Sequence, residues 1–296
     1  MKRSERAALW FVLPSVFLVG LFSIYPILES ARLSFYRMIL MLPWLGEKFV
    51  GLENYRDLAT DPVALDSLAI TLVFVGVSAA LEVLAGLGMA LLLNESFRAR
   101  GLVRAAVLVP WAIPTVVSSQ MWRYLFNDRY GLFNFLLFGR ATERYLAPLA
   151  DARLAPAAIV FADVWKTSSF AALIILAGLQ TIPDELYEAA AVDGATAWQK
   201  FRRVTLPLLK PALLLALLFR TIDAFKVFDL VFVMTQGGPA DATNVLQFYG
   251  YKKIFAEGMI GYGSAISVGV FCFSLVLSFF YIRLIGARVL EKGTAR

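Results

Sequence analysis

Several reactive residue types are absent or rare in this chain of 296 residues. It has no histidine, which excludes histidine-based triads, histidine acid–base pairs and histidine zinc sites. Its single cysteine, Cys272, excludes an internal disulfide or a CxxC motif. No Gly-x-x-x-x-Gly-Lys-Ser/Thr segment occurs, so there is no phosphate-binding loop for ATP. These absences exclude histidine-based catalysis, a histidine zinc site, a disulfide framework and an ATP-binding loop within this chain.

What is abundant is apolar surface. The chain is 59% hydrophobic with a mean hydropathy of +0.70, whereas soluble domains are about 45–50% apolar. The formal net charge is +6, but the basic residues flank apolar stretches and form no stripe. This pattern favours a protein embedded in the lipid bilayer and argues against nucleic-acid binding.

Long apolar stretches predict an all-α integral membrane protein with one transmembrane domain over 1–296. The first stretch follows a basic N-terminus and is too long, without a small-residue cleavage site, to be a signal peptide. Pro110 and Pro114 lie within the third stretch and predict a kink. A short apolar run at 131–138 predicts an interfacial helix. The six predicted spans are 7–28, 68–93, 105–122, 154–179, 208–234 and 263–282.

Loop charges predict the orientation, because cytoplasmic loops are enriched in Lys and Arg. One set of loops holds 14 Lys and Arg in 61 residues, and the other set holds 10 in 89. The denser set places both termini in the cytoplasm, together with the polar segment 183–207. That set consists of 1–6, 94–104, 181–210 and 283–296, and the other set consists of 37–66, 123–153 and 235–262.

The segment 183–207 has the pattern of a helix, a glycine turn and a second helix. Asp184 and Glu185 suit a first helical turn, and Gly194 stands where a helix end requires a left-handed residue. Small alanines follow Glu188, so a partner backbone can approach closely. Two interpretations stay open on this pattern: a docking element for another subunit, or an ordinary amphipathic loop.

Charged residues inside the predicted fifth span alternate in sign every three positions, at Arg220, Asp223, Lys226 and Asp229. Charges in a membrane are costly and mark candidate functional sites. The series is either the lining of a translocation pathway that offers hydrogen bonds to sugar hydroxyls, or a self-neutralising structural ladder. Ala224 and Val227 are neighbouring candidates on the same segment.

The fourth span contains a second charged pair, Asp163 and Lys166, at the same spacing. Trp165 lies between them and is a candidate pathway contact, because aromatic faces stack on sugar rings, although packing is the competing interpretation. Glu82 is the only charged residue in the second span. We expect it to pair with either Lys166 or Arg220.

The loop also shows a family resemblance. Glu188-Ala189-Ala190, Asp193-Gly194-Ala195, Leu206-Pro207 and Pro211 resemble the EAA loop of bacterial ABC importer permeases. Phe49 to Tyr55 and Thr235 to Pro239 resemble the carbohydrate-uptake branch. Val164 to Thr167 and Phe219 to Phe225 are most similar to the first permease subunit of trehalose/maltose-type transporters.

The resemblance implies a type I importer permease fold in the bacterial cell membrane. Its partners would be a second homologous permease, two ATP-binding-cassette ATPase subunits that hold ATP and Mg²⁺, and an extracytoplasmic sugar-binding protein. The coupling helix would dock into the ATPase through the six residues Glu188, Ala189, Ala190, Asp193, Gly194 and Ala195. The substrate would be a di- or oligosaccharide, and this chain itself would be a non-catalytic subunit with no metal and no cofactor of its own.

Three other functions remain as alternatives. A glycerol phosphate or similar solute is possible, but a phosphate favours an unpaired basic group, and here acids accompany the bases. A proton- or sodium-coupled secondary transporter would use Asp163, Asp223 or Asp229, yet no internal repeat is visible. A membrane scaffold without a pathway would not need the charged fifth span.

Overall fold

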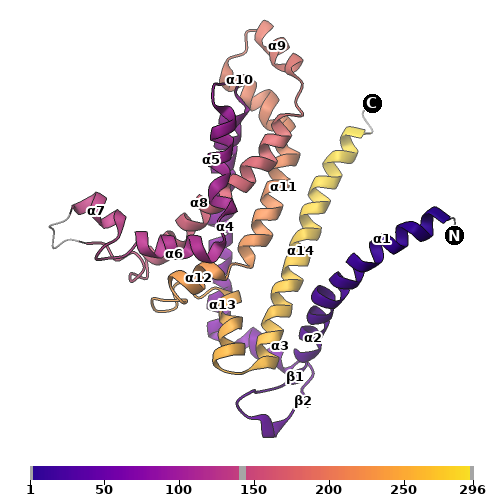
Figure 1. Ribbon diagram of the computed structural model, residues 1–296, viewed down its shortest axis with the longest axis vertical. Coiled ribbons are helices and arrows are strands. Elements are labelled where there is room, and N and C mark those ends of the chain that lie inside the picture. The colour runs from indigo at the N-terminus through magenta and orange to yellow at the C-terminus, as the bar shows by residue number, and fades with distance from the viewer. Residues whose placement is uncertain (1–2, 140–144, 294–296) are drawn as a thin grey trace. The chain divides into compact units, whose positions relative to one another are not determined.

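The computed structural model describes residues 3–139 and 145–293, and these are mostly helical. Five helical segments are long and apolar enough to cross a membrane, and one bent helix pair makes a sixth, which confirms the predicted number of spans. The spanning elements are α1 (Arg3–Val19) with η1 (Gly20–Ile24) and α2 (Tyr25–Leu33), α4 (Pro62–Asn94), α5 (Arg100–Ala112) with α6 (Thr115–Leu125), α8 (Leu154–Leu179), α10 (Ala197–Lys200) with η3 (Phe201–Thr205) and α11 (Leu206–Phe225), and α14 (Ile260–Gly293) (Figure 1).

Shorter elements connect the spans. The β structure of the described chain is a two-stranded antiparallel sheet and an isolated antiparallel bridge between Ile39 and Met259. The helix expected at 131–138 is present as α7. The short elements are β1 (Tyr36–Arg37), η2 (Pro43–Leu45), β2 (Lys48–Phe49), α3 (Glu53–Thr60), α7 (Leu132–Phe138), α9 (Asp184–Val192), α12 (Asp229–Met234), α13 (Leu246–Tyr251) and η4 (Lys252–Ala256).

The chain divides into two compact units. One contains residues 1–66 and 249–272, and the other contains 67–248 and 273–296. In the first unit, β1 pairs with β2 through Tyr36 and Phe49. The buried Asn54 amide donates hydrogen bonds to the carbonyl oxygens of Ser34 and Tyr36 at 2.8 and 2.9 Å. This amide fixes the hairpin to α3.

Asp61 joins three elements of the first unit. Its Oδ1 accepts the Val63 N–H at 3.0 Å and so caps the start of α4. Its Oδ2 accepts the hydroxyls of Tyr249 from α13 and Tyr262 from α14. Burial raises the pKa of Asp61, but the hydrogen bonds from the two tyrosines outweigh burial and lower it below the ordinary value. The carboxylate therefore holds this unit together in its charged form.

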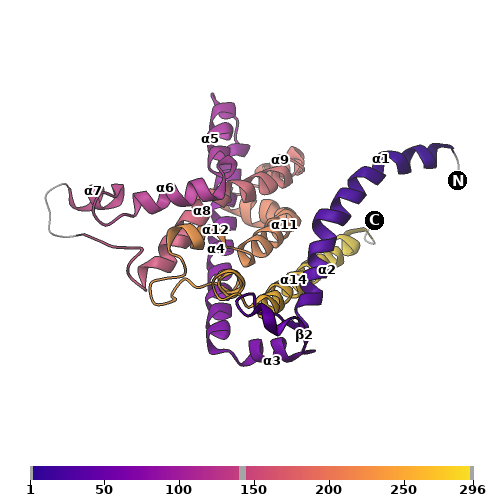
Figure 2. The same cartoon turned by 60° about the horizontal axis from the view of Figure 1, so that its bottom comes forward.

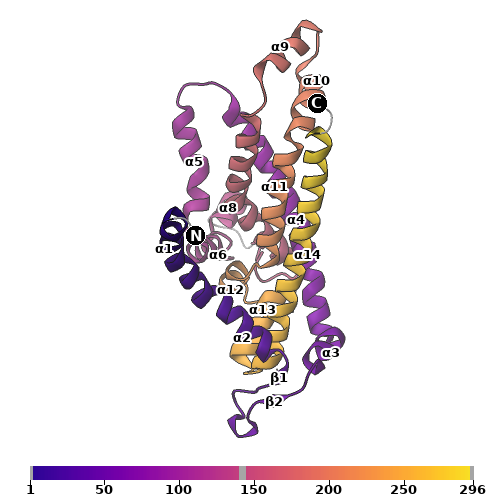
Figure 3. The same cartoon turned by 90° about the vertical axis from the view of Figure 1, so that its right-hand side faces the viewer.

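In the second unit, α8 packs against α5, α6, α11 and α12. Figure 3 shows the axes of α5, α8 and α11 nearly parallel. Small residues set the closest approaches. A Cβ on Gly86 of α4 would lie 2.8 Å from the Ala171 Cβ of α8, and a Cβ on Gly178 of α8 would lie 2.4 Å from the Ala212 Cβ of α11. These distances leave no room for larger side chains, as is common where membrane helices cross.

The third span is broken. The axes of α5 and α6 differ by 92° across Ile113 and Pro114, and α6 turns away from α5 toward α7 in Figure 2. Pro110, in contrast, lies inside α5. The predicted kink is confirmed, but only Pro114 stands at the break, where its fixed backbone and the extended conformation of the preceding residue end the helix.

The fifth span differs from the prediction of 208–234 at both ends. It begins at Ala197, because a π-turn lets Leu206 N–H donate to Phe201 O, so the helix continues past Pro207. It ends at Phe225, and α12 starts separately at Asp229. The segment 226–228 is therefore a second break.

We predict that Gly86→Val destabilises the α4–α8 packing by about 1–3 kcal/mol, because the new side chain would meet the Ala172 backbone nitrogen. Gly88→Val is the matched control on the same helix, since a Cβ at Gly88 has no neighbour within 4 Å. Thermal unfolding of the two variants in detergent measures the difference. Equal losses would contradict close packing at Gly86.

Candidate translocation cavity and coupling loop

The two helix breaks lie at one polar cavity of about 200 Å³ in the second unit. Trp111 and Thr115 approach it from the break in the third span, and residues 226–229 approach it from the break in the fifth. The cavity collects eight of the nine predicted pathway residues, which are Asp163, Lys166, Arg220, Asp223, Ala224, Lys226, Val227 and Asp229. Three acids and three bases line it, so its formal charge is balanced.

The Arg220 guanidinium is the centre of this arrangement. Its Nε donates to the Glu82 carboxylate of α4, its Nη1 donates to Asp223 at 2.8 Å, and its Nη2 lies 3.8 Å from the Asp163 carboxylate of α8. The side chains of Arg220 and Glu82 are 3% and 0% exposed, whereas that of Asp223 is 69% exposed. Arg220 therefore ties α4, α8 and α11 together, and Asp223 presents its carboxylate to the cavity.

This arrangement decides two questions that the sequence left open. Glu82 pairs with Arg220 and not with Lys166. The Arg220–Asp223 pair is confirmed, but the predicted series of charges along one helix is wrong beyond it, because α11 ends at Phe225. Lys226 and Asp229 line the cavity from the break and form no ion pair among the described residues.

Lys166 contacts the break in the third span, between α5 and α6. Its ammonium donates to the carbonyl oxygens of Ile113 at 2.7 Å and of Trp111 at 3.3 Å. The expected pair with Asp163 is not formed. The carbonyls at the end of α5 lose their helical partners at the break, and a cation at a helix C-terminus is favourable. Lys166 thus stabilises the broken span beside the cavity.

Trp165 lies outside the cavity. Its ring packs edge-on against Trp122 of α6, with the ring centroids 5.4 Å apart. Trp165 therefore has a packing role, which was the competing interpretation of this residue. The tryptophan at the cavity is Trp111, whose ring stacks on Phe170. Trp111 is a weaker candidate in the sequence, whereas sequence reasoning missed Thr115, Phe228 and Leu230. Proximity to Pro114 was the only signal that pointed to Thr115.

The coupling-loop helix α9 ends as predicted. Gly194 has φ +76°. Its N–H donates to Ala191 O at 3.0 Å, and Ala195 N–H donates to Ala190 O at 2.9 Å. These two bonds make a Schellman end after the C-cap residue Asp193. The motif therefore fixes the direction in which the chain leaves α9.

One face of α9 is anchored to the second unit and the other is free. Ile182, just before the helix, is buried in the core with Leu179 and Leu209, and the Tyr187 hydroxyl lies 3.1 Å from Thr205 Oγ1. Glu188 and Ala189 are exposed and Ala190 is half-buried. Within the described chain, Glu188 has no side-chain partner. The loop projects beyond α5 and α8 in Figures 1 and 3.

Broken spans around a balanced polar cavity, with an anchored surface loop, define a multi-pass membrane transport protein. Residues 82–290 match the model of the family described as the binding-protein-dependent transport system inner membrane component. The chain belongs to this family of ABC importer permeases, whose loop motif the sequence contains.

Relatives and solved structures agree with this assignment. The chain is 42% identical to the trehalose/maltose transport system permease protein MalF of Thermococcus litoralis, covering 95% of this chain and 94% of the relative. It is 40% identical to the trehalose transport system permease protein SugA of Mycobacterium tuberculosis, covering 96% and 90%. A permease chain in the crystal structure of a bacterial alginate ABC transporter matches with a TM-score of 0.81 at 21% identity, covering 96% of each chain. This likeness confirms the type I permease fold.

We predict that Arg220→Leu destabilises the protein by about 3–5 kcal/mol, because Glu82 would remain buried without a counter-charge. Adding Glu82→Leu should recover part of the loss, because the second change removes the orphaned carboxylate. Unfolding midpoints of both single variants and the double variant measure the coupling between them. Additive losses would contradict a direct Glu82–Arg220 interaction.

Proposed function

We propose that this chain is the permease subunit of an ATP-driven importer that moves a di- or oligosaccharide of the trehalose/maltose type into the cytoplasm. The main observation in support of this proposal is the polar cavity at the breaks in the third and fifth spans. Carboxylates and a guanidinium offer hydrogen bonds to hydroxyl groups there, and the balanced charge suits a neutral solute. The names of the two sugar-transporting relatives support the substrate class.

The balanced charge also distinguishes a sugar from a glycerol phosphate. Arg220 is already engaged by carboxylates, and Lys166 by backbone carbonyls. At Arg220 and Lys166 a phosphate would have to compete with these bonds, which leaves only Lys226 of the described cavity residues to bind it, whereas a hydroxyl can donate to Asp223 while Arg220 stays paired. Trp111, which is 48% exposed, offers an aromatic edge for a sugar ring.

The proposed assembly contains a second homologous permease, two ATPase subunits that bind ATP and Mg²⁺, and an extracytoplasmic sugar-binding protein. This chain itself binds no cofactor. The solved alginate transporter in complex with an alginate-bound periplasmic protein supports a binding-protein partner. In this assembly both termini and α9 face the cytoplasm of the bacterial cell, as the distribution of Lys and Arg predicts.

Docking of α9 into an ATPase subunit explains why its outer face is free. Glu188, Ala189, Ala190, Asp193, Gly194 and Ala195 form the proposed docking surface. Val192 extends it with an apolar side chain that is 89% exposed. A carboxylate beside small residues allows close approach of a partner and one charge-assisted hydrogen bond.

We predict that Glu188→Ala abolishes most ATP-dependent sugar uptake in vesicles and weakens co-purification of the ATPase subunit. The side chain is exposed and unpaired in the described chain, so the folded permease should keep its unfolding temperature. Glu185→Ala is the matched control, because it removes an exposed glutamate from the first turn of the same helix. Unchanged uptake with normal ATPase binding in Glu188→Ala would overturn the docking role.

We predict that Asp223→Asn lowers the kcat/KM of sugar uptake about tenfold, because a charge-assisted hydrogen bond contributes about 1.5 kcal/mol. Its side chain is largely exposed to the cavity, so the cost in stability should be small. Initial uptake rates across a range of sugar concentrations give this value, and Asp184→Asn on α9 controls for a general loss of one acid. A wild-type kcat/KM in Asp223→Asn would exclude this residue from the sugar site.

A further inference from the structure

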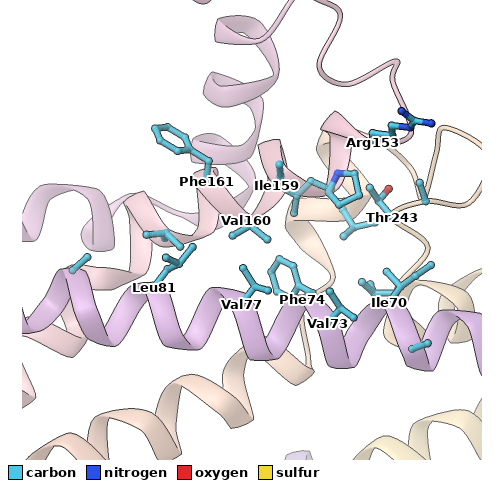
Figure 4. Close-up of a pocket in the computed structure, with 18 of the residues that line it drawn as sticks. Ile70, Val73, Phe74, Val77, Leu81, Arg153, Ile159, Val160, Phe161 and Thr243 are labelled. Atoms are coloured by element: carbon cyan, nitrogen blue, oxygen red, sulfur yellow. The ribbon is translucent and has the colours of Figure 1, made fainter.

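A second cavity of the same unit is apolar and unrelated to the polar site. It is a groove of about 910 Å³ between α4 and α8. Figure 4 shows Val73, Val77 and Leu81 of α4 on one side and Val160 and Phe161 of α8 on the other. Glu82 and Asp163, which belong to the Arg220 cluster, do not line this groove although they are neighbours of residues that do. The groove therefore lies on a different face of α4 from Glu82 and on a different face of α8 from the polar cavity.

The groove has the length and surface of a site for an acyl chain. Its lining runs along α4 from Ala69 to Ala85, which is about 24 Å of helix and exceeds the about 15 Å of hydrocarbon in one leaflet. Val73 is 66% exposed and Phe161 is 51% exposed. No described part of this chain fills the space.

One end of the groove is basic. Arg153 lies there near Thr243 in Figure 4, directly before the first residue of α8. In the described chain its guanidinium has no hydrogen-bond or ion-pair partner. The neighbouring Asp151 forms no ion pair with it, and Asp151 Oδ1 instead accepts the backbone N–H groups of Arg153 and Leu154 at 2.7 and 3.2 Å. A free cation thus stands at the end of a membrane span, at the mouth of an apolar groove.

We propose that this groove binds a phospholipid, with an acyl chain along α4 and the headgroup phosphate on Arg153. Charge complementarity selects this occupant: a guanidinium binds phosphate in a bidentate manner, and apart from Arg153 and Thr243 the groove is lined by apolar residues, which suit an acyl chain. An anionic headgroup is preferred over a zwitterionic one, because basic residues at the bilayer surface attract anionic lipids. The proposal rests on membrane embedding alone and does not depend on the transported solute.

The lipid would have a structural role beside the transport site. Leu81 and Val164 line the groove, and they are adjacent in the chain to Glu82 and Asp163 of the buried cluster. An acyl chain would fill the gap between α4 and α8 behind that cluster and keep the two helices in register.

The test uses the assembled transporter in vesicles of equal parts phosphatidylglycerol and phosphatidylcholine. After gentle detergent extraction, mass spectrometry measures the ratio of the two lipids retained by the complex. We expect enrichment of phosphatidylglycerol in the wild type and about a fivefold smaller enrichment in Arg153→Gln, because one basic residue contributes about 1 kcal/mol. Arg129→Gln is the control, since Arg129 is exposed but lies outside the groove.

A second pair of variants tests the acyl chain. Val73→Trp should fill the groove and remove the retained lipid, whereas Leu72→Trp, on the same helix but outside the groove, should not. Equal lipid retention in wild type, Arg153→Gln and Val73→Trp would overturn the proposal. So would a high-yield crosslink from Val77→Cys, in a Cys272→Ser background, to another protein subunit, because the groove would then hold a partner helix.

Discussion

The buried guanidinium of Arg220 is the interaction on which the second unit depends. A charge within the membrane is expensive unless it is paired and hydrogen-bonded, so Arg220 fixes the positions of the acids that surround it. Those acids come from three helices, α4, α8 and α11. A rotation or shift of any of the three helices would separate at least one acid from the guanidinium. The arrangement therefore limits the unit to few helix registers, and of the three acids Asp223 is the one most exposed to the cavity.

The two helix breaks are the second constraint. Backbone groups at a break have no helical partner, and in a membrane they must be satisfied by protein or lie beside a polar space. Lys166 satisfies the carbonyls at the first break, and both breaks open onto the same cavity. α6 and α12, the two segments that follow the breaks, also contact each other, with Arg123 donating to Val233 O at 3.3 Å. The cavity is thus a consequence of interrupting two neighbouring spans at the same level.

The continuous helix from Ala197 to Phe225 connects the coupling loop mechanically to the polar cavity. It joins the coupling loop to the end of α11, near Arg220, over 29 residues or about 43 Å. The π-turn at Phe201–Thr205 keeps the helix unbroken at Pro207. Displacement of the loop by a partner would therefore be transmitted along a rigid element directly to the residues that line the cavity. A loop followed by a separate span would absorb such a displacement.

The sequence by itself determined the membrane class, the number of spans, the glycine-ended coupling helix and the family, because these follow from apolar length, local backbone chemistry and a long motif. It also selected eight of the residues at the cavity, six of them because a charge in a span is rare. Only the tertiary structure decided that Glu82 pairs with Arg220, that Lys166 binds carbonyls and that Trp111 replaces Trp165 at the cavity. The physical reason is that each outcome depends on which helices are neighbours and where they break. Contacts between residues that are distant in the sequence leave no periodic pattern along the chain from which they could be predicted.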